Sequence, residues 1–395
     1  MRKLTLLLVL VLLAALALSP AAAQDDAFVI GLLMVGPYND NGWSQAHYDA
    51  VVYVTENLEN TQMIYLDRVN PADRQGTTPD QLAEELLDQG ADMIIFNSDD
   101  MKDGATTFAT NHPEIPVIHA SGDQRWEEGE NFVDLPNLGN AFPGMEWTKL
   151  VAGCAAAMTT ETGKIGYLGP LINDETRRLT ASAFLGAQYC WTEKRGMEAA
   201  DLEFRVDWIG FWFNIPGVTA DPTLVSDNFY NNGYDVVISG IDTTEGLVQA
   251  NAAAEAGATV FNVAYDYDLA CEIAPDVCLG SAVFNWRPMY LAEITEMQAG
   301  TWTPKFLWPQ PDYANYDDVT MNSTYFIPGT ALSEEAAAAL EELKSELAGG
   351  LDLWAGPINL QDGTPYIADG ETATLEQLWY LPQLLEGMDG QSVPE

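Results

Sequence analysis

Aromatic and polar side chains gather directly after the first predicted strand of this chain. Residues 28–34 form an apolar run, and the loop that follows holds Asn39, Asp40, Trp43 and Ser44. An indole offers a flat face for stacking, while amide, hydroxyl and carboxylate groups exchange hydrogen bonds with a ligand. The loop lacks a glycine-rich cradle, Lys and Arg, so its chemistry suits a small, flat, polar ligand better than a phosphate.

Further aromatic and acidic residues follow later predicted strands. We expect Trp212 to face Trp43 and sandwich a planar ring, and the acids to accept hydrogen bonds from amino or hydroxyl groups. The alternatives are that the indoles cap the two sheets as core and that the acids are solvated or cap helices. The candidates, with two residues expected at the floor of the site, are Asp103, Trp212, Asp242, Asp266, Asn285 and Trp286.

An enzyme would need a nucleophile, a base and an orienting group. Ser44 and His47 lie three residues apart on one predicted helix, and no third group accompanies them. The three histidines, His47, His112 and His119, lack the spacing of metal ligands. We therefore predict no catalytic residue, no metal site and no cofactor.

Strands and helices alternate along the chain twice over. The strands are expected at 28–34, 62–66, 92–96 and 116–119, and again at 164–168, 203–209, 235–239 and 259–263. This alternation predicts an α/β fold with two doubly wound parallel-sheet lobes. A further strand at 279–284 followed by a helix suggests a multi-crossing hinge of the class I periplasmic binding protein type, with a ligand cleft between the lobes.

We expect the lobes to be built from discontinuous segments. Residues 28–137 with about 278–305 would form the first lobe, and about 138–268 with about 317–395 the second. Chains of this length exceed one ordinary core, which is consistent with two lobes.

The charge balance is strongly acidic. The sequence has 59 Asp and Glu against 16 Lys and Arg, a formal net charge of -43. Such a field repels nucleic acid and anionic membrane surfaces, and it weakly disfavours an anionic ligand. We expect no nucleic-acid partner.

The N-terminus has the pattern of a secretory signal peptide. Arg2 and Lys3 precede an apolar run over 4–18, and three alanines end at Ala23, where we expect cleavage. An uncleaved anchor is the alternative, but the run is short for a membrane span. No lipobox Cys follows, so we expect a periplasmic or secreted protein without a lipid anchor.

Four cysteines are expected to form two disulfides after export. Cys271 and Cys278 enclose a short loop, which favours their pairing. Cys154 and Cys190 lie on predicted helices that flank the strand near Ile165, so a second pair is plausible.

Several short motifs, in order, resemble one family. They are GPYNDNGWSQAH after the first strand, TGKIGYLG at 162–169, AYDYD at 264–268, SAVFNWRPMY at 281–290 and AGPINLQDG at 355–363. Together they resemble the basic membrane protein (BMP, PnrA-like) family of ABC transporter substrate-binding proteins, whose known members bind purine bases or nucleosides.

The resemblance implies roles for particular residues. Trp43 would be the stacking ring, Trp212 the aromatic of the second lobe, and Asp103 and Asp266 the acids that follow strands of each lobe. A Lys that nucleoside-binding members use for the ribose falls near Phe284 in this chain. That departure is compatible with a free purine base.

We therefore expect a monomeric binding protein that captures a purine base or nucleoside and passes it to ABC permease subunits in the membrane. Two alternatives stay open at this point. The ligand could be another small polar molecule such as a sugar, or the protein could be a ligand-sensing module for a membrane receptor.

Overall fold

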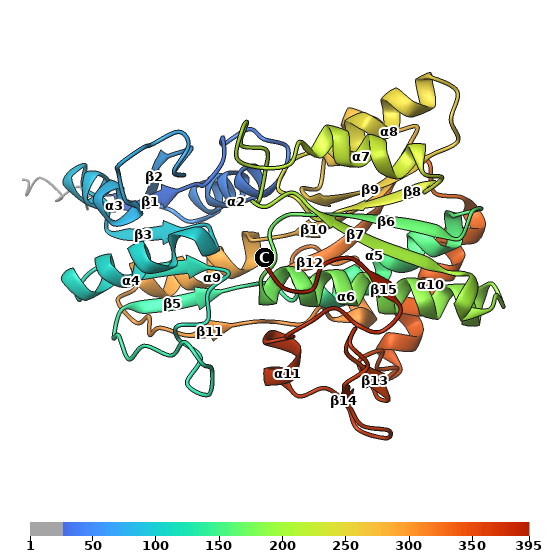
Figure 1. The fold of residues 1–395 in the computed structure, drawn as a ribbon. Helices are drawn as coiled ribbons and strands as arrows, with labels where there is room; N and C mark the ends of the chain where they lie inside the picture. Colours follow the sequence, from blue (N-terminus) through green and yellow to red (C-terminus); the bar gives the residue numbers. More distant parts are fainter. Residues whose placement is uncertain (1–26, 395) are drawn as a thin grey trace, which may run out of the picture.

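The computed structural model describes residues 27–394 and has two parallel sheets with helices packed against them (Figure 1). The predicted α/β class with two parallel-sheet lobes is confirmed. The predicted signal peptide, residues 1–23, lies outside the described residues. Within 27–394, no helix is both long enough and apolar enough to span a bilayer.

The first sheet has the strand order β11-β5-β4-β3-β1-β2, and its strands pair in parallel. Its central strands are fully buried apolar runs, as expected for parallel strands that are covered on both faces. The strands are β1 (Phe28–Leu33), β2 (Thr61–Leu66), β3 (Met93–Phe96), β4 (Val117–Ala120), β5 (Leu138–Ala141) and β11 (Phe306–Leu307).

Helix α3 of the first lobe begins with a clear capping signal. Thr78 and Gln81 form a capping box at the start of α3, where Pro79 takes the first helical position. The helical elements are α2 (Trp43–Asn57), α3 (Pro79–Asp88), η1 (Asp99–Met101), α4 (Lys102–Asn111) and α9 (Arg287–Gln298).

The second sheet has the strand order β12-β10-β9-β8-β6-β7-β15. Its order β7-β6-β8-β9-β10 repeats the order β2-β1-β3-β4-β5 of the first sheet, so the two lobes share one topology. Only β12 is antiparallel, on β10. The strands are β6 (Lys164–Gly169), β7 (Glu203–Trp208), β8 (Val236–Ser239), β9 (Phe261–Asp266), β10 (Cys278–Phe284), β12 (Thr324–Pro328) and β15 (Met388–Asp389).

The second lobe contains a very close helix pair, α5 (Met145–Thr159) and α6 (Asp174–Tyr189). A Cβ on Gly153 would lie 1.8 Å from the carbonyl oxygen of Ala183, so the two backbones nearly touch. The Cys154–Cys190 disulfide links this pair, and Cys271–Cys278 closes the loop before β10, so both predicted pairings are confirmed.

The remaining elements complete the second lobe and its C-terminal extension. They are η2 (Cys190–Lys194), η3 (Ala199–Asp201), α7 (Pro222–Asn231), α8 (Glu245–Glu255), η4 (Ala270–Ile273), η5 (Tyr313–Asn315), α10 (Glu334–Ala348), β13 (Ile358–Asn359), β14 (Pro365–Ile367) and α11 (Leu375–Trp379).

Two of the predicted lobe boundaries are wrong. Strand β5 pairs with β4 in the first sheet, whereas residues from 138 on were expected in the second lobe. Strand β10 pairs with β9 in the second sheet, whereas residues from 278 were expected in the first lobe. A buried apolar strand fits either sheet, and only the pairing register decides which one it joins.

The chain crosses between the sheets after β5, after β10 and after β11. Asn285 lies in the second crossing and connects it to the third crossing. Its side-chain amide donates to the carbonyl oxygens of Val319 (2.7 Å) and Asn322 (2.8 Å). The rings of Phe142 and Phe284, whose centres lie 5.5 Å apart, connect the first crossing to the second. The hinge is therefore one packed unit.

Replacing Asn285 should loosen this unit. Asn285→Ala leaves two carbonyl oxygens without their donor, so we expect a loss of about 1–3 kcal/mol in the free energy of unfolding. Urea unfolding followed by circular dichroism measures it. The exposed Asn231 at the end of α7 supplies the control, Asn231→Ala. Equal stabilities of the two variants would show that the hinge amide contributes nothing.

Candidate functional site

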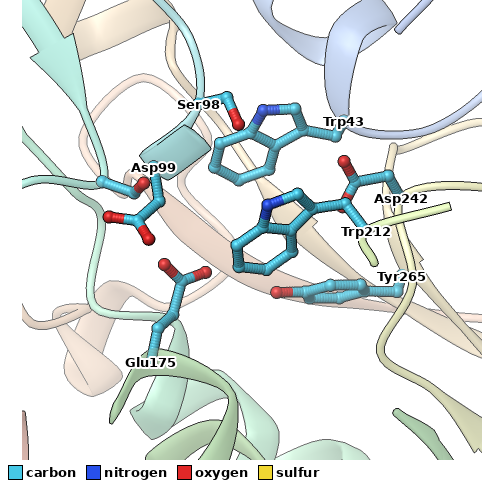
Figure 2. Close-up of a pocket in the computed structure, with 8 residues that line it drawn as sticks. Trp43, Ser98, Asp99, Glu175, Trp212, Asp242 and Tyr265 are labelled. Atoms are coloured by element: carbon cyan, nitrogen blue, oxygen red, sulfur yellow. The ribbon is translucent and has the colours of Figure 1, made fainter. Parts of the chain in front are cut away.

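A small pocket lies between the two lobes, with an empty volume of about 270 Å³. Figure 2 shows its lining, in which two indoles, a phenol ring and three carboxyl groups surround one space. The lining residues are Trp43, Ser98, Asp99, Ser121, Glu175, Trp212, Asp242 and Tyr265.

Topology brings these residues together from both sheets. In the first lobe they follow β1, β3 and β4, and in the second they follow β6, β7 and β8 or lie in β9. The carboxyl ends of parallel strands meet at one edge, and ligands bind outside that edge where the strand order reverses. Here two such edges face one another.

Trp43 is fixed by its neighbours before any ligand arrives. Its side chain is 6% exposed and meets the rings of Phe284 and Trp286 edge-on, at 5.0 and 5.3 Å. Its Nε1 donates to the carbonyl oxygen of Asn97 at 2.5 Å. The indole is therefore oriented by packing on three sides and a hydrogen bond.

Trp212 reaches the same pocket from the opposite lobe (Figure 2). It is 7% exposed, and its carbonyl oxygen accepts from the backbone N–H of Asp242 at 2.9 Å, which fixes the loop. Among residues 27–394 its buried Nε1 has no hydrogen-bond partner. That donor is free to meet an acceptor on a ligand.

The polar lining is acidic, and none of the eight described lining residues is a Lys, Arg or His. Burial raises the pKa of Glu175 to about 8, against the lowering effect of Arg178. Burial, reinforced by the nearby Asp266, also raises the pKa of Asp242 well above its usual range. The pocket thus disfavours anions and offers acceptors.

A buried cation lies just behind this lining. The Lys149 ammonium sits 3.5 Å from the centre of the Tyr265 ring and donates to the carbonyl oxygen of Ser239 at 2.8 Å. Burial lowers the pKa of Lys149 to about 7, and attraction to Asp266 opposes that shift. Lys149 therefore supports Tyr265 from outside the pocket.

The two lobes touch across the pocket, so the cleft is closed. The backbone N–H of Trp43 donates to the carbonyl oxygen of Asp242 at 3.3 Å. Gln45 donates from Nε2 to the Tyr267 hydroxyl at 3.0 Å. On the other side of the pocket, Asn173 donates from Nδ2 to Asp99 Oδ2 at 3.4 Å.

Three of the predicted site residues, Trp43, Trp212 and Asp242, line the pocket. Asp266 is completely buried beside Tyr265, at the end of β9, and does not line it. Asp103 is exposed in the first turn of α4 and does not line the pocket either. The acid after β3 that lines the pocket is instead Asp99.

The other predicted residues of the first loop support it or face solvent. Asp40 accepts from the backbone N–H groups of Gly42, Ser44 and Gln45, and so holds the turn before α2. Burial raises the pKa of Asp40 to about 6. The Ser44 hydroxyl accepts from the Gly36 N–H at 3.0 Å, and Asn39 is exposed.

Asn285 and Trp286 lie in the second crossing and do not line the pocket floor. Trp286 is fully buried and stacks on His47 at 4.0 Å, and His47 in turn contacts the Tyr290 hydroxyl through Nδ1 at 2.6 Å. Both residues therefore belong to the hinge, and Trp286 also packs against Trp43.

The sequence interpretation missed Asp99, Glu175, Tyr265, Ser98 and Ser121. Glu175 had a usable signal, because it stands in the first turn of a helix that follows β6, whose carboxyl end faces the cleft. Asp99 could have been found by preferring the acid nearest the end of β3.

Gly42 permits the backbone contact between the lobes. A Cβ at this position would lie 1.8 Å from the carbonyl oxygen of Asp242, closer than any side chain can approach. Only glycine allows the lobes to meet as they do here.

Gly42→Ala should therefore hinder closure without unfolding the protein. We expect adenine, used as the probe, to bind at least about tenfold more weakly in calorimetric titration. This corresponds to a loss of about 1.4 kcal/mol in binding free energy. The exposed Gly349, whose φ is ordinary for any residue, gives the control Gly349→Ala. Unchanged affinity in Gly42→Ala would show that the lobes need not meet at this point.

Two known proteins match most of this chain in sequence. A purine-binding protein of Brucella abortus is 24% identical over 384 residues, which cover 97% of this chain and 99% of the relative. A Haloferax volcanii protein named as an ABC transporter glucose-binding protein is 23% identical and is matched over 82% of this chain and 73% of its own length.

The fold also matches a solved ABC transporter solute-binding protein from Aeropyrum pernix, with a TM-score of 0.65 and 13% identity over 84% of this chain and 93% of that one. The model of the Bmp family, described as ABC transporter substrate-binding protein PnrA-like, matches residues 27–306, more than half of the chain. The chain therefore belongs to the Bmp family of PnrA-like substrate-binding proteins of ABC transporters.

Proposed function

We propose that this binding protein captures a purine base or nucleoside in its closed cleft and delivers it to an ABC permease. The observation that carries the proposal is a small pocket flanked by one indole from each lobe, with carboxyl groups as its charged lining. Closure of two lobes over a ligand brings both aromatic faces to it at once.

The aromatic lining favours a flat ligand, because Trp43, Trp212 and Tyr265 bring three rings to one small pocket. Stacking of a base on an aromatic side chain contributes about 1–3 kcal/mol. A purine ring has two faces and can use both Trp43 and Trp212.

The polar lining favours a ligand rich in hydrogen-bond donors. Asp99, Glu175 and Asp242 accept from amino, ring N–H or ribose hydroxyl groups. A nucleotide phosphate would meet these carboxyl groups in a closed pocket without a cation in its lining, so bases and nucleosides fit better than nucleotides.

The Brucella relative supports a purine, because its name is that of a purine-binding protein and it matches nearly the whole chain. The Haloferax relative supports a second candidate, a sugar, because its name is that of a glucose-binding protein. Sugar sites also combine aromatic faces with carboxyl groups, so the ligand class is decided by titration.

We further propose that the protein works as a monomer outside the cytoplasm, in the periplasm or secreted, after removal of residues 1–23. The family to which it belongs is that of extracytoplasmic ABC transporter substrate-binding proteins.

Titration of the purified protein with adenine, guanine, adenosine, guanosine and glucose tests the ligand class. We expect at least one purine to bind with a Kd below about 100 μM, roughly 5.5 kcal/mol of binding free energy, and to quench tryptophan fluorescence. Binding of glucose in this range, without binding of any purine, would replace the proposal by the sugar alternative.

Trp212→Ala tests the aromatic wall of the second lobe. Loss of one stacked ring should weaken purine binding by about 1–3 kcal/mol, or about 5- to 150-fold, in calorimetry. Trp208 offers a matched control in the same lobe, since it lies outside the pocket and donates from Nε1 to Gln391. An equal effect of Trp208→Ala would mean that Trp212 acts through stability alone.

A further inference from the structure

Two carboxyl side chains face each other across the closed pocket. Asp99 comes from the loop after β3 in the first lobe, and Glu175 from the first turn of α6 in the second. Figure 2 shows both carboxyl groups directed into the same part of the pocket, beyond the six-membered rings of the indoles. Asn173, two residues before Glu175 in the chain, donates to Asp99 from its amide.

Two cations lie near Glu175, and each also has other contacts. Arg178 lies one turn further along α6, with its Nε 3.7 Å from Glu146 and its guanidinium 4.1 Å from the centre of the Trp379 ring. Lys149 donates to Ser239 and lies over Tyr265. No cation among the described residues that line the pocket opposes the carboxyl pair.

The other groups that face Glu175 are acids or phenols. Burial is the largest cause of its raised pKa, Arg178 opposes the shift, and repulsion by Asp99 and Glu146 adds to it, so the pKa reaches about 8. Glu175 in turn contributes to the raised pKa values of Asp242, Asp266, Tyr167 and Tyr265. Like charges held this close in a buried pocket do not all stay ionised.

We propose that Glu175 is a specificity-determining residue that takes up a proton when the cleft closes. Its neutral carboxylic acid group then recognises a ligand edge on which a hydrogen-bond acceptor lies beside a hydrogen-bond donor. A neutral acid donates through its O–H and accepts through its C=O. The amidine edge of adenine, a ring nitrogen beside an amino group, matches both. The inference rests on the proposed purine function and adds which edge of the purine base the protein recognises.

The coupling between adenine binding and proton uptake predicts how the affinity changes with pH. The pKa of a solvated glutamate is about 4.3, whereas burial in the closed cleft raises the pKa of Glu175 to about 8. Under the proposal, closure excludes water from Glu175, so adenine binding adds a proton at this residue between these pH values. Through Glu175 the association constant should fall by up to about tenfold for each pH unit from about pH 5 to 8, and then level off.

Calorimetric titration with adenine in buffers of different ionisation enthalpy, at pH 6, 7 and 8, measures this uptake. We expect the wild type to take up about one more proton per adenine than Glu175→Gln at pH 6 and 7, and about half a proton more at pH 8. Comparison with the variant removes any uptake at Asp242, whose pKa burial also raises. Glu175→Gln should still bind adenine, with a weaker pH dependence, because its amide presents the same donor and acceptor but does not titrate. The exposed Glu193, in the same lobe, gives the control Glu193→Gln, which should behave as the wild type.

Three outcomes would overturn the inference. Adenine binding without proton uptake in the wild type would show that Glu175 stays ionised. Equal uptake in the wild type and Glu175→Gln would assign the proton to another acid. Failure of every purine to bind at any of these pH values would overturn the proposed function and this inference together, and is distinguishable from the first two outcomes, in which adenine binds.

Discussion

The contact between Gly42 and the carbonyl group of Asp242 is the constraint on which the closed cleft depends. It joins the first turn of α2 in one lobe to the loop after β8 in the other, and the backbone N–H of Trp43 donates across it at 3.3 Å. Because Trp43 and Asp242 also line the pocket, the residues that close the cleft also form the pocket wall. The binding site is therefore complete only when the two lobes meet.

Closure also sets the electrostatics of the pocket. Carboxyl groups that water would solvate in an open cleft become buried together, and burial is the largest cause of the raised pKa of Glu175 and Asp242. The nearby cations, Arg178 and Lys149, are engaged by Glu146, aromatic rings and a backbone carbonyl. A ligand that brings donors relieves this unfavourable environment, whereas an anion worsens it.

The hinge holds the first aromatic wall in place. Trp286 and Phe284 pack edge-on against Trp43, and Asn285 between them ties two crossings together. The same segment therefore guides the motion of the lobes and orients the stacking ring. This explains why residues 284–286 carry such large, buried side chains although they do not line the pocket.

The sequence by itself determined the α/β class, the doubled strand–helix alternation and the pairing of Cys271 with Cys278, because buried strands, helices and short cysteine loops have local signatures. It also pointed to Cys154 and Cys190 as a second candidate pair, and to Trp43 and Trp212, which both line the pocket. It did not determine which sheet receives β5 and β10, since an apolar strand fits either one and long-range pairing decides. Nor could it separate Asp99 from Asp103, which lie one helical turn apart and differ only in the direction they face. Only the tertiary structure shows that Asn285 and Trp286 support the hinge, and that Glu175 meets Asp99 across the cleft, because that meeting depends on how two distant lobes close.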